Sequence, residues 1–191
     1  HISQEIGAPT QDITSQQVIE KAKSHRSFGI AYTYNEPFIW YEFVLETAKL
    51  AKKNNLKNVL VTNGYVNMDP LEGMLPYIDA MNIDLKSFDD KFYTKVCKGS
   101  LKPVLDVIKR AHKSCHIELT NLIIPTLNDS EETIRKMVDW IYENLGPEVP
   151  LHFSRYFPCY TLSLPATPVE TLEKAKRIAK SKLKYVYLGN V

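Results

Sequence analysis

The residues best suited to chemistry occur in short polar motifs that directly follow apolar or β-branched runs. One motif is Asn35-Glu36-Pro37, in which the carboxylate could accept hydrogen bonds from a cationic amine and the proline could fix the turn into a helix. The alternative is an ordinary helix-entry turn with a capping carboxylate. Taken alone, the residues favour that alternative because the motif is so short.

Asp84 and Lys86 form a second motif. They are two residues apart near the end of an apolar run, so in a strand both side chains point to the same side. A lysine at the mouth of a barrel could pair with a ligand carboxylate or, if desolvated, could form a Schiff base. A buried Asp–Lys ion pair that only holds the end of the strand is an equally good interpretation.

The third motif, Thr62-Asn63-Gly64, offers a hydroxyl, an amide and an exposed backbone, which suit a ribose or a carboxylate. Asn-Gly is also a common turn dipeptide, and a plain turn is the favoured interpretation. The sequence has no Ser-His-Asp order and no metal-ligand spacing. We expect His116 to be structural or solvated, whereas His152 leads a strand and could face either way.

The elements that must position these motifs alternate between strand-like runs and amphipathic helical stretches. Strands that are apolar on both faces and alternate with helices indicate an α/β fold with parallel strands. A polar residue follows each strand, as at the active face of a (β/α) barrel, and six strands cannot close an eight-strand barrel. We therefore predict one domain over residues 1–191, a partial TIM-type barrel. The six runs are Phe28 to Tyr34, Lys57 to Thr62, Met81 to Leu85, His116 to Ile124, Leu151 to Tyr156 and Lys184 to Leu188.

Helix starts are predicted from capping motifs. Thr167 is expected as an N-cap with Pro168 in the first helical position, and Asp129 and Thr14 are expected to cap two further helices.

Composition excludes several classes of protein. The 191 residues carry 24 basic and 22 acidic side chains, a net charge of +2, which argues against a dedicated nucleic-acid binder. No apolar run approaches the roughly 20 residues of a membrane span, and no signal-peptide pattern opens the chain. The 3 cysteines are scattered, which favours reduced thiols in a cytoplasmic protein.

The ordered set of motifs resembles the radical S-adenosylmethionine (SAM) superfamily, in particular the AmmeMemoRadiSam-type proteins, which are akin to pyruvate formate-lyase-activating enzymes. The resemblance covers essentially the whole chain. The motifs that carry it are Tyr34-Asn35-Glu36-Pro37, Thr62-Asn63-Gly64-Tyr65, Asn82-Ile83-Asp84-Leu85-Lys86-Ser87 and Ile124-Pro125-Thr126-Leu127-Asn128-Asp129.

The resemblance implies a [4Fe-4S] cluster that reductively cleaves SAM to a 5′-deoxyadenosyl radical, which abstracts hydrogen from a substrate. Asn35, Glu36 and Pro37 match the family's G-G-E-P position, where the carboxylate receives the methionine ammonium. Thr62 and Asn63 would line the SAM site, and Asp84 and Lys86 would contact polar groups of SAM. The substrate is unknown and could be a protein, and flavodoxin or ferredoxin would donate the electron.

The chain departs from the family in two places. Tyr34 and Asn35 replace the two glycines of G-G-E-P, so close backbone approach to the ligand is less assured. The cluster motif C-x-x-x-C-x-x-C is absent, and Cys97, Cys115 and Cys159 have the wrong spacing to replace it. We expect that the first strand and the cluster loop are missing, that the chain is a fragment of a longer protein, and that alone it binds no cluster and is inactive.

Two other functions stay open at this stage. One is a cluster-free lyase or aldolase that uses Lys86 as a Schiff-base amine, and the other is a non-enzymatic barrel that binds a ligand or a partner protein. Without a first strand, the run Phe28 to Tyr34 would be an exposed edge through which two copies of the chain could pair.

Overall fold

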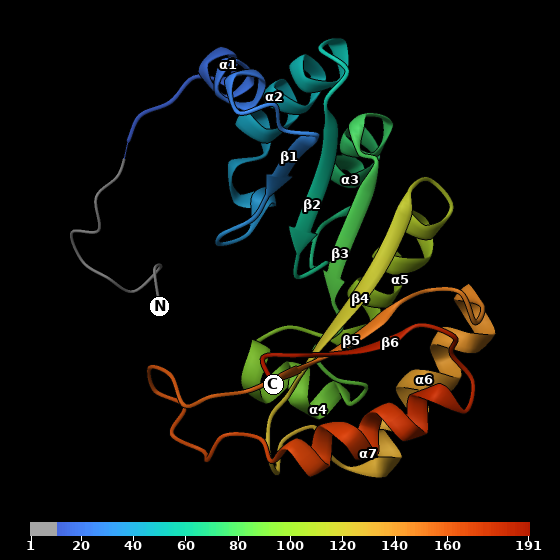
Figure 1. Ribbon diagram of the computed structural model, residues 1–191. Coiled ribbons are helices and arrows are strands. Elements are labelled where there is room, and N and C mark those ends of the chain that lie inside the picture. The colour runs from blue at the N-terminus through green and yellow to red at the C-terminus, as the bar shows by residue number, and fades with distance from the viewer. Residues whose placement is uncertain (1–10) are drawn as a thin grey trace.

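A single parallel sheet of six strands organises the computed structural model, which describes residues 11–191 (Figure 1). The strands are hydrogen-bonded in chain order, β1 to β6, and every neighbouring pair is parallel. This order confirms the predicted partial (β/α) barrel. The strands are β1 (Gly29–Tyr32), β2 (Lys57–Thr62), β3 (Ala80–Asp84), β4 (His116–Ile123), β5 (Leu151–Arg155) and β6 (Val186–Gly189).

Helices connect the strands and cover one face of the sheet (Figure 1). Because the strands are parallel, each connection must cross back from one end of the sheet to the other, and a helix is the usual means. The helices are α1 (Ser15–Ser24), α2 (Tyr41–Lys53), α3 (Met68–Met74), α4 (Asp90–Phe92), α5 (Leu101–His112), α6 (Glu131–Leu145) and α7 (Val169–Lys180). None of these described helices is long and apolar enough to span a membrane.

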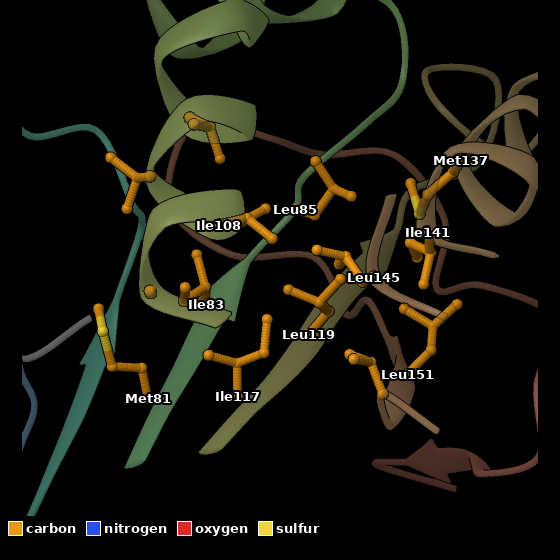
Figure 2. Packing of buried hydrophobic residues seen from close by; sticks show 14 of the residues in the cluster. Met81, Ile83, Leu85, Ile108, Ile117, Leu119, Met137, Ile141, Leu145 and Leu151 are labelled. Atoms are coloured by element: carbon orange, nitrogen blue, oxygen red, sulfur yellow. The ribbon is translucent and has the colours of Figure 1, made fainter. Parts of the chain in front are cut away.

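The hydrophobic core lies between the helices and the sheet (Figure 2). Alternate residues of each central strand point into it, and Leu119 of β4 and Ile83 of β3 are fully buried there. The labelled strand residues of Figure 2 are Met81, Ile83, Ile117, Leu119 and Leu151, and the helix residues that meet them are Ile108, Met137, Ile141 and Leu145.

The opposite, concave face of the sheet is not apolar. The residues that alternate with the buried ones on β3 and β4 include Asn82, Asp84, Glu118 and Thr120, and they are only half-buried. The prediction that the strands are apolar on both faces was therefore wrong for these strands. The sequence alternates between apolar and polar residues here because one face packs against helices and the other lines an open concave surface.

Strand β1 lies at one edge of the sheet, and within residues 11–191 it pairs only with β2. This is the edge position expected for it. Its free backbone groups could pair with a further strand.

Two of the three predicted caps were wrong. Thr14 caps α1 with the expected capping box to Gln17. In contrast, Ser130 rather than Asp129 caps α6. Thr167 caps no helix, because its buried hydroxyl donates to the Ile123 carbonyl of β4 at 2.6 Å.

Candidate functional site

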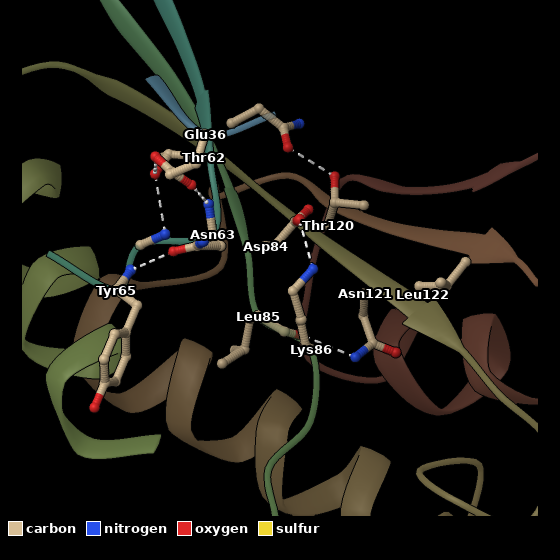
Figure 3. A network of polar contacts seen from close by, with 12 residues as sticks. Glu36, Thr62, Asn63, Tyr65, Asp84, Leu85, Lys86, Thr120, Asn121 and Leu122 are labelled. Atoms are coloured by element: carbon tan, nitrogen blue, oxygen red, sulfur yellow. Dashed lines mark hydrogen bonds and ion pairs between the residues drawn. The ribbon is translucent and has the colours of Figure 1, made fainter. Parts of the chain in front are cut away.

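Five of the seven predicted site residues line one cavity at the carboxyl ends of β1, β2 and β3, and Figure 3 shows four of them, Thr62, Asn63, Asp84 and Lys86. The cavity has a volume of about 360 Å³. Parallel strands place the loops that follow them at the same end of the sheet, and this topology brings the motifs together. The lining residues are Thr33, Tyr34, Asn35, Val61, Thr62, Asn63, Asp84 and Lys86.

Glu36 does not line this cavity but a neighbouring one of about 460 Å³, and its carboxylate is hydrogen-bonded to two residues in the wall of the first. Its carboxylate accepts hydrogen bonds from the Thr62 hydroxyl at 2.7 Å and from the backbone N–H of Asn63 at 2.8 Å. It also accepts one from the Phe38 N–H at 3.3 Å, as the cap of the 3-10 helix Pro37–Trp40, which begins at the buried Pro37. The capping role is therefore real. A carboxylate has about four lone-pair positions, so these three bonds leave capacity for one further donor.

The turn after β2 is built around Gly64. Its φ of +69° favours glycine, and a Cβ there would lie 2.8 Å from the Ile83 side chain. The turn directs the Asn63 side-chain oxygen to the Tyr65 N–H at 2.7 Å. Within residues 11–191 the Asn63 Nδ2 has no acceptor, so the turn leaves a free amide donor in the cavity wall.

Asp84 and Lys86 point to the same side, as predicted, and form an ion pair of 2.8 Å (Figure 3). About a third of each side chain is exposed, at 34% and 38%. The pair is therefore not the buried ion pair that was the alternative interpretation, and a pair this exposed contributes little to stability. Both charged groups remain accessible from the cavity.

Three buried side chains to which the sequence assigned no role at the site hold the backbone at Leu85 and Lys86. The Lys86 N–H donates to the Tyr93 hydroxyl at 3.1 Å, and its carbonyl accepts from Asn128 Nδ2 at 2.6 Å. Asn121 Nδ2 donates to the preceding Leu85 carbonyl at 2.7 Å. Asn128 lies in a polar segment that reads as a loop and helix cap, so no local signal distinguishes its role.

A second polar group occupies the amino-terminal part of the concave face. Glu118 accepts from the rings of His152 at 2.6 Å and His116 at 3.2 Å, and the Tyr187 ring stacks on His152. Partial burial opposes ionisation, but the hydrogen bonds from both histidines hold the pKa of Glu118 below its usual value. The structure thus shows that His152 faces the concave side.

The cysteines do not form a metal-binding group. Cys97, Cys115 and Cys159 are all free and lie in separate parts of the fold. Burial raises the pKa of the Cys115 thiol to about 11. Within the described part of the chain, no three His, Cys, Asp or Glu side chains are placed to hold a metal ion. These residues therefore do not fit an iron–sulfur cluster.

The chain is similar to known proteins over most of its length. Residues 5–141 match the family model of the radical SAM superfamily. An uncharacterised protein of Methanocaldococcus jannaschii, MJ0808, is 46% identical over 96% of this chain, which spans 55% of that protein. A pyruvate formate-lyase-activating enzyme of Clostridium pasteurianum is 25% identical over 87% of this chain and 75% of its own length.

Solved structures show the same fold. A domain of a pyruvate formate-lyase-activating enzyme from Bacteroides vulgatus superimposes with a TM-score of 0.74 at 16% identity, covering 85% of this chain and 99% of that domain. The match to the family model spans more than half of the 191 residues. The chain therefore belongs to the radical SAM superfamily.

Proposed function

We propose that the protein to which this chain belongs cleaves SAM to a 5′-deoxyadenosyl radical and uses that radical to remove hydrogen from a protein substrate. The observation that carries the proposal is the charge arrangement around the cavity. Lys86, Thr62 and Asn63 line the cavity, and the Glu36 carboxylate is hydrogen-bonded to Thr62 and Asn63. The amino-acid end of SAM carries an ammonium and a carboxylate, which are complementary to these two charges.

Each polar group has a distinct task in this proposal. Glu36 accepts a hydrogen bond from the ammonium, using the lone pair that its contacts leave free. Lys86 pairs with the carboxylate, and Asp84 holds the lysine side chain at the cavity. The free Asn63 Nδ2 adds a neutral donor to the same wall. These groups bind and orient the ligand, and no step of the chemistry is assigned to them.

Cluster ligation is not among the tasks of these residues. A cluster of the kind this family uses would supply the electron for cleavage of the sulfonium, but the 3 cysteines of the sequence lack the family spacing and, in the described chain, do not come together. Its ligands would have to be supplied from outside these 191 residues. We therefore expect the 191 residues alone to be inactive, and we expect flavodoxin or ferredoxin to reduce the whole protein.

The proposed substrate class follows from the names of relatives. Several are activating enzymes, including those of pyruvate formate-lyase and (2S)-3-sulfopropanediol dehydratase. We propose a protein substrate of the same general kind. Because the chain spans 55% of MJ0808 and 38% of the dehydratase-activating enzyme, the activity proposed is that of the whole protein.

The Schiff-base alternative has less support. A nucleophilic lysine needs a desolvated amine, but Lys86 is 38% exposed and is paired with Asp84. Trapping with borohydride in the presence of pyruvate tests it directly, and a covalent adduct on Lys86 would favour a lyase over the radical function. A non-enzymatic binding barrel would give neither the adduct nor a cluster signal.

The experiment that tests the proposal is electron paramagnetic resonance of the full-length protein, reconstituted anaerobically with iron and sulfide and then reduced. We expect a cluster signal that shifts when SAM is added. In Glu36→Gln the same shift should need at least roughly tenfold more SAM, because an ionic acceptor becomes a neutral one. Glu46→Gln, an exposed glutamate on α2, is the matched control and should behave like the wild type.

Three results would contradict the proposal. They are the absence of any cluster, a cluster signal that does not respond to SAM, and an unchanged SAM dependence in Glu36→Gln. The first two would leave the binding barrel as the better hypothesis. The third would leave a radical enzyme whose ammonium site lies elsewhere.

A further inference from the structure

A second cavity of about 270 Å³ lies next to the first, and Asn63 and Lys86 line both of them. It is closed on one side by the segment after β2 and on the other by the segment after β3. The function proposed above leaves this cavity unassigned. Its other lining residues are Tyr65, Tyr93, Cys97, Lys98 and Gly99.

The wall of this second cavity has an unusual backbone. Tyr93–Cys97 forms one π-helical turn, and Lys98 ends it in the left-handed region with a φ of +58°. Gly99 lies so close to Tyr65 that a Cβ would be 3.1 Å from the ring. Single π-helical turns and left-handed non-glycine residues are unfavourable and are found disproportionately at functional sites.

The free polar groups of the second cavity are hydrogen-bond donors. The Tyr93 hydroxyl oxygen accepts from the Lys86 N–H, but among residues 11–191 nothing accepts its own proton, although only 3% of the residue is exposed. Asn63, whose Nδ2 is the neutral donor named above for the first cavity, also lines this one, and Nδ2 has no acceptor among the described residues. The Lys98 ammonium forms no ion pair in the described chain, and no carboxylate lines the cavity. A buried tyrosine hydroxyl usually donates to an acceptor. No acceptor for the Tyr93 hydroxyl is present in this cavity among the described residues, so a ligand could supply it.

The charge balance narrows the kind of acceptor. Lys86 is paired with Asp84 and is assigned above to the ligand of the first cavity, which leaves Lys98, an exposed lysine, as the one cation in the wall without a counter-charge in the described chain. Burial raises the pKa of the Cys97 thiol, so at neutral pH this group is uncharged. One uncompensated positive charge and several donors match a monoanion with several lone pairs, and a carboxylate has both properties.

We propose that the second cavity binds a carboxylate group of a ligand other than SAM, held by Lys98, Tyr93 and Asn63. The group could belong to a small free acid or to an acidic side chain of a protein substrate. Only its position beside the cofactor rests on the function proposed above. The binding itself is argued from the cavity and needs neither cofactor nor cluster.

The test is an NMR titration of this chain with acetate and with the capped dipeptide N-acetyl-Ala-Asp-amide. Acetamide and N-acetyl-Ala-Asn-amide serve as neutral counterparts. We expect saturable shifts of the Lys98 and Gly99 amide signals with the two carboxylates and at least tenfold weaker binding of the neutral compounds. Tighter binding of acetate would assign a small free acid, and tighter binding of the dipeptide would assign a peptide substrate.

Lys98→Gly is the decisive variant. Glycine adopts positive φ without strain, so the variant should fold at least as stably as the wild type while its carboxylate binding falls at least tenfold. Lys95→Ala removes an exposed lysine from the same turn that does not line the cavity, and it should bind like the wild type.

Several outcomes would overturn the inference. They are equal binding of the neutral compounds, unchanged binding in Lys98→Gly, and loss of acetate binding when SAM is added, which would assign the cavity to the carboxylate of SAM. Because the titration needs no cluster, a failed resonance experiment would leave this inference standing. Conversely, failure of the titration would leave the radical function untouched.

Discussion

Along β4, Leu119 and Ile123 point towards the helices and are fully buried, whereas Glu118 and Thr120 point to the concave face and stay half-exposed. The same strand therefore serves two different surfaces. In most parallel sheets both faces are packed and apolar. Here one face of the sheet packs into the core. The other face presents polar side chains along the strands up to the candidate site.

This difference separates stability from function along each central strand. Residues facing the helices gain free energy from burial of apolar surface, whereas residues on the concave face make exposed hydrogen bonds and ion pairs of small net value. The separation breaks down at the ends of the strands. There, buried amides such as Asn128 contribute to stability and also fix the backbone of Lys86, which lines the cavity.

The largest effect is expected from a substitution on the helix side. Leu119→Ala should lower the free energy of unfolding by roughly 3 kcal/mol, because it removes buried methyl groups and leaves a cavity. Thr120→Ala, on the neighbouring concave position, loses only a half-buried hydrogen bond to Asn82 and should cost about 1 kcal/mol or less. Urea unfolding of this chain measures both. Equal losses would contradict the division between the two faces.

An intermediate effect is expected for Asn128→Ala. It removes the donor to the Lys86 and Leu122 carbonyls and the acceptor of the Ile124 N–H, so it should cost roughly 2 kcal/mol. SAM binding by the full-length protein should weaken as well, because the Lys86 backbone is released. Asn144→Ala is the control: it loses one exposed hydrogen bond on α6 and should lower the free energy of unfolding by only about 0.5 kcal/mol. A stable Asn128→Ala with unaltered SAM binding would remove Asn128 from the site.

The smallest effect concerns acid stability. The pKa of Glu118 is lower in the folded protein than in the unfolded chain, so the unfolded state takes up the proton first as pH falls. Its stabilising contribution is present above the unfolded pKa of about 4.5 and is lost as pH falls through the folded pKa. Glu118→Gln should therefore flatten the decline of stability below about pH 5 by well under 1 kcal/mol.

Unfolding at several pH values with Glu46→Gln as the control checks this prediction. The control should keep the acid sensitivity of the wild type, because Glu46 is exposed on α2 and hydrogen-bonds to no described residue. If Glu118→Gln retains the full acid sensitivity, the two histidines do not hold the carboxylate in solution as they do here.

Much of the fold follows from local patterns. Each predicted strand overlaps an observed one, and β2 has the predicted bounds, Lys57–Thr62, because apolar runs between turn residues are a local signal. Caps were less predictable. Thr167 precedes Pro168 and reads as an N-cap, yet its hydroxyl is drawn to the Ile123 carbonyl of a strand far away in the sequence.

The candidate site, like the fold, was only partly predictable from the sequence. The polar motifs after β1, β2 and β3 were visible because charged and amide side chains that follow apolar strands stand out against the core. The roles of Asn121 and Asn128 were not visible, because an asparagine that bonds a distant carbonyl has the same local surroundings as one in a plain loop. Their partners are set by the register of β3 and β4.

The sequence by itself determined the parallel α/β architecture and the order of the polar motifs, because hydrophobic periodicity and turn residues act over a few neighbours. Only the tertiary structure decided that Glu36 bonds Thr62 and Asn63 and that Asn63 and Lys86 line two cavities. Those features join residues from different strands. Their distances depend on strand pairing and sheet curvature, which no short stretch of sequence encodes.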